Sequence, residues 1–386
     1  MKLNGSDIIA EVLIEQGVDT IFGYPGGAVL NIYDALYKYR DKIHHILTAH
    51  EQGASHAADG YARATGKTGV VIATSGPGAT NLVTGIATAY MDSIPMVAIT
   101  GNVGTSYIGK DAFQEVYITG ITMPITKHNF FVSDIKELAP TLREAFKIAN
   151  SGRKGPVLVD IPKDVTAAIT EYEKAAPEVI IDNTVINEDE VKKAAALINK
   201  AKRPVIEIGG GVVSSEASDL VRMLVNKTGA PCCHTLMAAG VLGYSERLNY
   251  GLVGMHGSFV TNKAIDEADV LVAIGTRFSD RVALNTNRFA HKAKVIQIDI
   301  DLSEVDKNVK VDHALVGDVK TIVMDLLHYV KQSDRTDWLK TLDEYKNSDY
   351  HPVDSDKFIT PHQLIRAICE NVPKDTVYVT DVGQHQ

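Results

Sequence analysis

One acidic residue stands where a parallel sheet could use it for chemistry. His50-Glu51-Gln52-Gly53-Ala54 follows a short apolar run and opens a segment rich in small residues. A carboxylate in the first turn of a helix is often only a partner of the helix dipole. In an open α/β sheet, however, this position faces the edge where ligands bind, beyond the carboxyl ends of the strands. Glu51 is therefore a candidate site residue, with dipole pairing as the simpler interpretation.

Short apolar runs are also followed by two glycine-rich segments. These are Tyr24-Pro25-Gly26-Gly27-Ala28 and Thr74-Ser75-Gly76-Pro77-Gly78-Ala79-Thr80-Asn81. Glycines at a strand-to-helix turn let the backbone approach a ligand closely. Asn81 adds a side chain that both donates and accepts hydrogen bonds. Each segment alone is equally consistent with a structural turn, and the second also with a phosphate-binding helix N-terminus.

The elements that position these residues alternate between helix and strand. Helical periodicity covers residues 6–16, with Ser6 as the expected N-cap, and residues 53–64. Buried strands are expected at 20–22, 45–47, 70–74, 96–100 and 156–161, which are apolar runs bounded mostly by glycine or proline. This alternation predicts an α/β fold in which helices cover both faces of a parallel sheet.

The pattern restarts after a polar stretch at 170–190. Helices are expected at 190–200, 217–227 and 319–330, and strands at 204–208, 270–274 and 295–300. A charged connector at 332–356 leads to a last helix at 361–371 and a last strand at 376–380. One helix and one strand cannot bury a core. We therefore expect this tail to dock on another domain, or further sequence to belong after Gln386.

Composition excludes several classes of function. The net charge of −9 argues against a nucleic-acid-binding surface, which needs a basic excess. No apolar run approaches the ~20 residues that span a bilayer, and no signal peptide is recognisable. The three cysteines, Cys232, Cys233 and Cys369, match neither a disulfide framework nor a zinc site. We expect a reduced, cytoplasmic protein with structural thiols.

Taken together, the motifs resemble a known family. YPGGA at 24–28, HEQGASHAADGYARATG at 50–66 and TSGPGATN at 74–81 resemble, in wording and order, the pyrimidine-binding domain of thiamine-diphosphate enzymes. IGKDAFQE at 108–115 narrows the resemblance to acetolactate synthase large subunits, also called acetohydroxyacid synthases. GPV at 155–157 and IPKDV at 161–165 fit the same family, so the resemblance runs almost from end to end.

The resemblance implies an activity and its partners. Pyruvate is decarboxylated on thiamine diphosphate, and the hydroxyethyl unit is joined to a second 2-ketoacid, pyruvate or 2-ketobutyrate, in the first committed step of branched-chain amino-acid biosynthesis. Glu51 aligns with the glutamate that hydrogen-bonds the aminopyrimidine ring and thereby activates the cofactor, which itself carries the carbanion chemistry. The family assembles as homodimers or tetramers with the site between two subunits, and a regulatory small subunit is an expected partner.

Further roles follow from the aligned positions. Catalytic roles fall to Glu51, Gln114 and Lys163, and thiamine contacts to Tyr24, Pro25, Gly26, Pro77 and Asn81. The substrate cavity would be lined by Gly27, Ala112, Phe113 and Gln114. Asn102-Val103-Gly104 departs from the family's GQVP, so we expect a looser local wall. A lysine after proline, such as Lys163, is otherwise most simply a solvated loop residue.

The middle of the chain resembles the FAD-contacting segments of biosynthetic family members. Gly209-Gly210-Gly211 is not a clean dinucleotide fingerprint by itself. The FAD contacts implied by the resemblance are Arg153, Gly210, Gly211, Thr235, Leu236, Met255, His256, Gly275, Arg277, Asp280, Arg281, Val282, Asp299, Ile300, Gly317 and Asp318. The flavin would be structural, without a net redox role. Packing explains Met255 and His256 more simply, and surface ion pairs explain Arg277 and Arg281. Ser279 stands where the family often has Asp.

The C-terminal segment resembles the start of a diphosphate-binding domain. Val382, Gly383, Gln384 and His385 would contact the diphosphate, whereas the family's ligands for Mg²⁺ lie in a motif expected beyond Gln386. We expect the 386 residues alone to have little or no acetolactate activity.

The expected organisation is α/β, with successive doubly wound parallel-sheet domains. A pyrimidine-binding domain covers 1–168, a linker 169–188, a central FAD-binding-type domain 189–332, a second linker 333–358, and the incomplete third domain 359–386. Two alternatives remain: another thiamine-diphosphate enzyme, such as a glyoxylate carboligase or a pyruvate oxidase, and a non-catalytic flavin-binding or regulatory protein.

Overall fold

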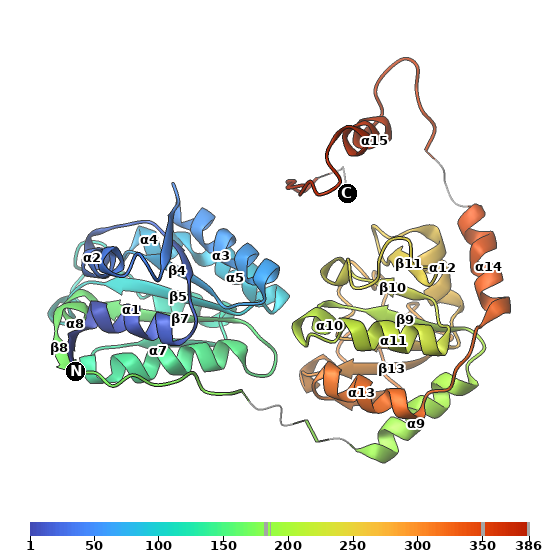
Figure 1. The fold of residues 1–386 in the computed structure, drawn as a ribbon, viewed down its shortest axis with the longest axis horizontal. Helices are drawn as coiled ribbons and strands as arrows, with labels where there is room; N and C mark the ends of the chain where they lie inside the picture. The colour runs from blue at the N-terminus through green and yellow to red at the C-terminus, as the bar shows by residue number, and fades with distance from the viewer. Residues whose placement is uncertain (181–183, 186, 349–351, 384–386) are drawn as a thin grey trace. The chain divides into compact units, whose positions relative to one another are not determined.

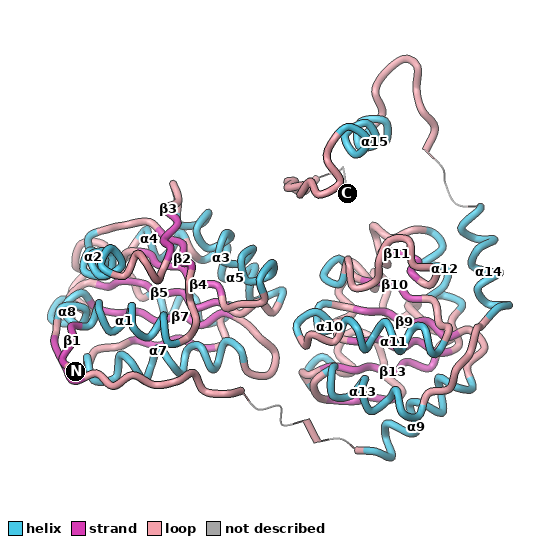
Figure 2. The backbone as a smooth tube through the Cα atoms, in the orientation of Figure 1, coloured by secondary structure: helices cyan, strands magenta, loops and turns pink. Residues whose placement is uncertain are grey.

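Runs of β-branched and apolar residues form two parallel sheets, each between layers of helices (Figure 1 and, as a tube, Figure 2). The computed structural model describes residues 1–180, 184–185, 187–348 and 352–383. The chain divides into two compact units, Met1–Asn183 and Thr184–Gln386. This is the α/β architecture of several parallel-sheet domains that the sequence predicts.

The sheet of the first unit contains six parallel strands. Its central strands are buried on both faces, as the continuous apolar runs require. Their order is β3 (His44–Leu47), β2 (Thr20–Gly23), β4 (Gly69–Ala73), β5 (Met96–Asn102), β7 (Pro156–Pro162) and β6 (His128–Phe131). After β2 the chain adds β3 on one side of β2, and it then returns to add β4 on the other side. The chain therefore changes direction between β2 and β4.

Helices cover both faces of this sheet. One core contains side chains of α1 (Gly5–Glu15), α2 (Leu30–Lys38), α7 (Ile135–Asn150) and α8 (Lys163–Ala167). The opposite core contains α3 (Glu51–Thr65), α4 (Pro77–Asn81), α5 (Val83–Asp92) and α6 (Ile118–Thr122). A separate antiparallel pair joins β1 (Lys2–Asn4) to β8 (Ile169–Glu171).

The sheet of the second unit also has six parallel strands. Their order is β11 (Asn249–Leu252), β10 (Cys232–His234), β9 (Pro204–Ile208), β12 (Val270–Ile274), β13 (Lys294–Asp299) and β14 (His313–Val316). The chain adds strands outward from β9 on one side, then returns to place β12 on the other. The change of direction therefore lies between β9 and β12.

Two helical layers cover the second sheet as well. One core holds α9 (Glu188–Lys200), α10 (Gly210–Ser214), α11 (Ser218–Thr228) and α13 (Val319–Tyr329). The opposite core holds α12 (Phe259–Glu267) and α14 (Thr336–Asn347), which contributes the buried Trp338 and Leu342. The last helix, α15 (Pro361–Asn371), begins with a capping box at Thr360 and has no buried residue.

Four local predictions differ from the structure. Asn4, not Ser6, caps α1, because its side chain accepts from the Asp7 amide at 2.8 Å. The expected linker at 169–188 begins with strand β8, and Tyr172 is buried in the first core. The expected linker at 333–358 contains α14, which packs through Trp338. Residues 376–380 form no strand, since they have no partner strand to complete the backbone hydrogen bonds.

Candidate functional site

Glu51 begins α3 directly beyond the carboxyl end of β3. The helix starts there because His50 caps it, with its ring Nδ1 accepting a hydrogen bond of 3.1 Å from the Gln52 amide. Glu51 is only 8% exposed, although it lies in the first turn of a helix. A surface partner of the helix dipole would stay solvated, so this burial distinguishes Glu51 from an ordinary first-turn acid.

Asn81 holds the Glu51 carboxylate. Its Nδ2 donates a hydrogen bond of 3.0 Å to Glu51 Oε2, from the last residue of α4 to the first residue of α3. Gly78 lies next to the other carboxylate oxygen of Glu51: a Cβ added at Gly78 would lie 3.2 Å from Oε1. Among the described residues Glu51 has no ion-pair partner, so the carboxylate is oriented by a neutral donor and keeps an oxygen for another.

Thr74 connects the first glycine-rich turn to the second. Its Oγ1 accepts a hydrogen bond of 3.2 Å from the backbone amide of Ala28. A Cβ added at Gly26 would lie 2.5 Å from the Thr74 side chain, so this contact requires glycine. The turns after β2 and β4 therefore pack together where the chain changes direction, which is where open α/β sheets bind ligands.

Gly76 and Gln114 bring a third motif to the same edge. Gly76 has φ +62°, and a Cβ there would lie 2.8 Å from both the Cβ and the carbonyl oxygen of Gln114. Gln114 itself has φ +59°, a conformation that non-glycine residues adopt infrequently. Glu115 shapes the turn by accepting hydrogen bonds from the backbone amides of Gly109 and Ala112. Within the described residues, the side-chain amide of Gln114 has no hydrogen-bond partner.

The loop that carries Gln114 is anchored to α8. Asp164 accepts from the Thr105 amide at 3.0 Å and from the Thr105 hydroxyl at 2.5 Å. The neighbouring Lys163 is exposed, and in the described part of the chain its ammonium pairs with no carboxylate. Phe113 is 86% exposed. Lys163 and Phe113 are thus free to meet a ligand or another chain, but nothing in the unit brings them against Glu51.

A buried carboxyl that the sequence did not single out fixes the start of this loop. Asp160 accepts from the Thr100 hydroxyl at 2.7 Å and from Asn102 Nδ2 at 2.6 Å, and its burial raises its pKa to about 6. Asn102 Oδ1 in turn accepts from the Val103 amide at 2.7 Å. These two hydrogen bonds fix Asn102 and the Val103 amide at the start of the loop. Strand pairing brings these residues together, because Thr100 lies opposite Asp160 and Asn102 lies opposite Pro162. The sequence alone does not show this register.

Tyr33 is a second residue that sequence reasoning missed. Its hydroxyl lies 3.2 Å from His45 Nε2, and a Cβ at Gly23 would come within 2.6 Å of it. Burial raises the pKa of Tyr33, and the nearby negative charge of Glu51 raises it further. Burial lowers the pKa of His45. The Tyr33 hydroxyl and the His45 ring are therefore both neutral near pH 7. No sequence motif contains these two residues, so the sequence did not predict their contact.

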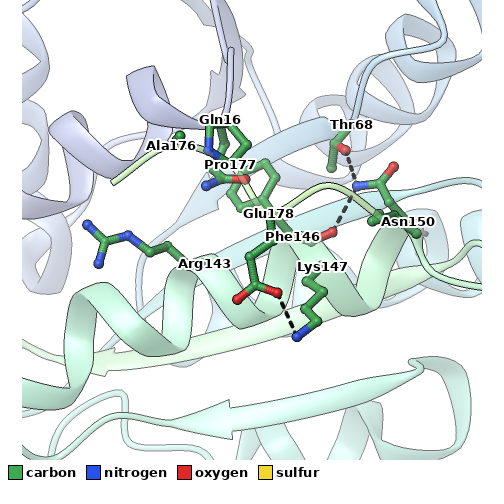
Figure 3. A pocket seen from close by; sticks show the side chains of 10 residues that line it. Gln16, Thr68, Arg143, Phe146, Lys147, Asn150, Ala176, Pro177 and Glu178 are labelled. Carbon is green, nitrogen blue, oxygen red and sulfur yellow. Dashed lines mark hydrogen bonds and ion pairs between the residues drawn. The ribbon is translucent and has the colours of Figure 1, made fainter. Parts of the chain in front are cut away.

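A small cavity of the first unit lies at the opposite end of the sheet (Figure 3). It measures about 180 Å³ and is lined by Gln16, Thr68, Asn150 and residues of α7 and the segment after Tyr172. Asn150 donates to Thr68 Oγ1 at 2.8 Å, and Lys147 pairs with Glu178 at 2.7 Å. None of the predicted site residues lines it, so this cavity is separate from the candidate site.

The predicted flavin contacts of the second unit lie along one edge of its sheet. Each follows the carboxyl end of a strand: Gly210 and Gly211 after β9, Thr235 and Leu236 after β10, Met255 and His256 after β11, Gly275 to Val282 after β12, Asp299 and Ile300 at the end of β13, and Gly317 and Asp318 after β14. Backbone packing joins the turns after β11 and β12, because the Met255 amide donates to the Arg281 carbonyl at 2.8 Å.

Two glycine turns cross at the change of direction in this sheet. The Gly211 amide donates to the Gly275 carbonyl at 3.1 Å, and a Cβ at Gly275, where φ is +60°, would lie 2.6 Å from Gly211 Cα. The strand order, read outward from β9, is that of dinucleotide-binding sheets, whose ligand lies at this crossing. The exposed side chains of Leu236, Met255, His256, Asp280 and Arg281 flank the same edge.

The remaining predicted residues are Arg153 and the C-terminal residues 382–385. Arg153 belongs to the first unit, where its Nε donates to Ser93 Oγ at 2.9 Å. Val382 and Gly383 are exposed, while Gln384 and His385 fall outside the described residues. In the described ranges no group of three or more His, Cys, Asp or Glu side chains could hold a metal ion. No helix in those ranges is long and apolar enough to cross a membrane.

Comparison with known proteins agrees with this arrangement. Residues 3–121 match the family described as thiamine pyrophosphate enzyme, N-terminal TPP binding domain, and residues 191–326 match thiamine pyrophosphate enzyme, central domain. A probable acetolactate synthase large subunit of Methanocaldococcus jannaschii is 47% identical over the whole chain, which covers 67% of that relative.

Bacterial relatives give the same result. An acetolactate synthase of Mycobacterium leprae is 47% identical over the whole chain, which covers 63% of its length. The large subunit of Lactococcus lactis is 43% identical over 99% of the chain, which covers 67% of that subunit. The chain thus spans about two thirds of the length of these curated relatives. It belongs to the acetolactate synthase large-subunit family of thiamine pyrophosphate enzymes.

Proposed function

We propose that the complete protein is an acetolactate synthase, which decarboxylates pyruvate and joins the two-carbon unit to a second 2-ketoacid. The observation that carries the proposal is the buried Glu51 carboxylate, held by Asn81 where the glycine turns after β2 and β4 pack together. Family membership supplies the reaction class, and this geometry supplies a carboxylate suited to it.

The residues around Glu51 fit the aminopyrimidine half of thiamine diphosphate. That cofactor, when bound, supplies a carbon nucleophile that stabilises negative charge. Glu51 holds or accepts a proton at a pyrimidine nitrogen, and its burial strengthens that charge-assisted hydrogen bond. Asn81 fixes the carboxylate through Oε2, and Gly78 leaves Oε1 uncovered by a side chain. Tyr24, Pro25, Gly26 and Pro77 would hold the ring.

The second 2-ketoacid requires a cation and a polar group near the reacting carbon. Lys163 offers an ammonium that no described carboxylate neutralises, and Gln114 offers a free amide positioned by Gly76. Gly27, Ala112 and Phe113 would contact the 2-ketoacid beside them. Val382, Gly383, Gln384 and His385 would hold the diphosphate, together with Mg²⁺.

The second unit holds FAD in a structural role. The support is the crossing of Gly211 and Gly275 in a sheet with the strand order of dinucleotide-binding domains. Arg277, Arg281 and the turns at Asp299 and Gly317 would hold the flavin nucleotide. The enzyme works as a homodimer or tetramer, with a regulatory small subunit as a further partner.

Product analysis tests the proposed function. The complete gene product, supplied with thiamine diphosphate, Mg²⁺, FAD and pyruvate, should release carbon dioxide and acetolactate in equal amounts. Adding 2-ketobutyrate should divert part of the product to acetohydroxybutyrate. Accumulation of acetate, or of a product that forms only from glyoxylate, would instead identify another reaction of the same cofactor.

A further inference from the structure

A buried polar row crosses the centre of the second sheet. Strand register places Glu207 of β9 opposite Ala273 of β12, and Ala273 opposite Gln297 of β13. Neighbouring residues in this register point to the same face, and the small Ala273 leaves room above itself for the two longer side chains. Both Glu207 and Gln297 are fully buried. A carboxyl at such a position is rare unless a partner compensates for its lost hydration.

Thr276 contacts both ends of this row. Its hydroxyl donates a hydrogen bond of 2.9 Å to Glu207 Oε1, and its carbonyl accepts one of 3.3 Å from Gln297 Nε2. Thr276 follows Gly275 directly, so these bonds fix the turn that crosses Gly211. The heads of Glu207 and Gln297 therefore lie against one residue, on strands separated only by β12.

The row contains two acceptors that lack a donor. Glu207 Oε2 and Gln297 Oε1 are both buried and have no hydrogen-bond partner among the described residues. The titratable and charged groups around them are Cys233 on β10, opposite Glu207, the adjacent Cys232, and Glu304 after β13, which pairs with Lys307 at 2.9 Å. In the described chain no cation pairs with Glu207. If a proton binds Glu207 Oε2, that atom becomes a hydrogen-bond donor, and Gln297 Oε1 is the unpaired acceptor that could receive the bond.

We propose that Glu207 is kept as a neutral carboxylic acid at and below neutral pH, and that its proton, shared with Gln297, locks Thr276 and the Gly275 turn onto the sheet. Glu207 is thus a positioning residue for the glycine crossing. Loss of the proton leaves a buried anion whose one donor among the described residues is the Thr276 hydroxyl, and the turn loosens.

The electrostatics agree with this geometry. Burial raises the pKa of Glu207 from 4.5 to about 7, outweighing the opposite effect of the Thr276 hydroxyl. A carboxyl whose pKa is higher in the folded than in the unfolded state stabilises the fold fully below the unfolded value. That contribution is lost progressively as the pH rises from about 4.5 to about 7, and is absent above.

Trp338 provides a local probe for the test. It is the only tryptophan in the sequence, is buried in the core on the same face of the sheet as Glu207, and donates to the Pro204 carbonyl at 3.2 Å. Its fluorescence therefore reports unfolding of the second unit alone. Thermal unfolding of the full chain is followed from pH 5 to pH 8.5 for the wild type and for Glu207→Gln, in which an amide N–H replaces the acid O–H.

The expected result is a pH-dependent difference between the two proteins. The midpoints should agree within about 1 °C at pH 5, and the variant should become more stable by at least about 3 °C at pH 8. A difference that stays constant with pH would overturn the proposal. So would failure of Glu207→Gln to fold at pH 5, because a neutral isostere must be tolerated where the native group is neutral.

A second readout rests on the proposed flavin site. FAD titration of the wild type should weaken by up to about tenfold per pH unit above pH 7, since one proton is linked to the bound form. Glu207→Gln should bind FAD with little dependence on pH. Equal pH dependence in both proteins would contradict the role of Glu207 in the turn. Absence of flavin binding at any pH would reject the flavin site, while the Trp338 experiment still decides the state of Glu207.

Discussion

Asn81 donates a 3.0 Å hydrogen bond to Glu51 from a helix that follows a different strand. The two residues are 30 positions apart in sequence, yet the parallel order β3-β2-β4 places both turns at one edge. Neither helix end by itself would make Glu51 more than a partner of the dipole. Their contact converts a first-turn glutamate into an oriented, buried carboxylate.

Replacing Glu51 tests its chemical role. Glu51→Gln keeps the size of the side chain but removes the charge that a protonated pyrimidine nitrogen requires. In the complete protein we expect acetolactate formation to fall by about 10²–10⁴-fold, the usual range for losing a general acid–base group. Exchange of the cofactor's reactive proton with solvent deuterium should slow with it.

Glu137→Gln is the matched control for this substitution. Glu137 also lies in the first turn of a helix, α7, but is exposed. It should leave the rate unchanged, because dipole pairing at the surface contributes little. Equal losses in the two variants would mean that Glu51 acts only through its helix.

Replacing Asn81 tests the orientation of the carboxylate. Asn81→Asp places a second carboxylate about 3.0 Å from Glu51, and two such groups retain a shared proton to higher pH. The acid limb of the pH–rate profile of the complete protein should therefore move to higher pH. Asn81→Ala removes the donor without adding charge, so it should lower the rate and move that limb by less than Asn81→Asp does. An unshifted limb in Asn81→Asp would show that the two side chains are uncoupled.

Gly76→Ala tests the contact with Gln114. Gly76 has φ +62° with ψ −119°, which costs a non-glycine residue more than the roughly 1–2 kcal/mol of the left-handed helical region, and the added Cβ also meets the backbone of Gln114 at 2.8 Å. Gly66→Ala, where φ is +73°, ψ is 0° and nothing lies within 4 Å, carries only the milder left-handed strain and no clash. Hydrogen exchange of the β4 amides should therefore show a larger loss of stability for Gly76→Ala than for Gly66→Ala. Equal losses would remove the argument that Gln114 is positioned by Gly76.

Gly275→Ala tests the glycine crossing of the second unit. Its Cβ would meet Gly211 Cα at 2.6 Å, a clash between two backbones that no side-chain movement relieves. Gly240→Ala, with φ +93° and open space around it, supplies the strain without the clash. Trp338 fluorescence should show that Gly275→Ala unfolds earlier in urea, and FAD binding should be lost in this variant and retained in Gly240→Ala. Retention of FAD by both would place the flavin elsewhere.

Local signals made most of the fold predictable. The strands at 204–208 and 270–274 coincide with β9 and β12, because a short apolar run bounded by loops can bury both faces only in a parallel sheet. The errors concern pairing and capping. Ser6 has a side chain suited to capping, but Asn4 occupies the required position. Residues 376–380 read as a strand, yet a strand exists only where another supplies its hydrogen bonds.

The sequence by itself determined the family and most of the order of the elements, and it singled out Glu51 as a candidate, since these depend on residue types and short spacings. Only the tertiary structure decided that Asn81 holds Glu51, that Gly76 positions Gln114, and that Glu207, Thr276 and Gln297 share a buried row. Register and crossing angle bring such residues together over long stretches of chain. No local pattern encodes that proximity, because it arises from the packing of the whole sheet.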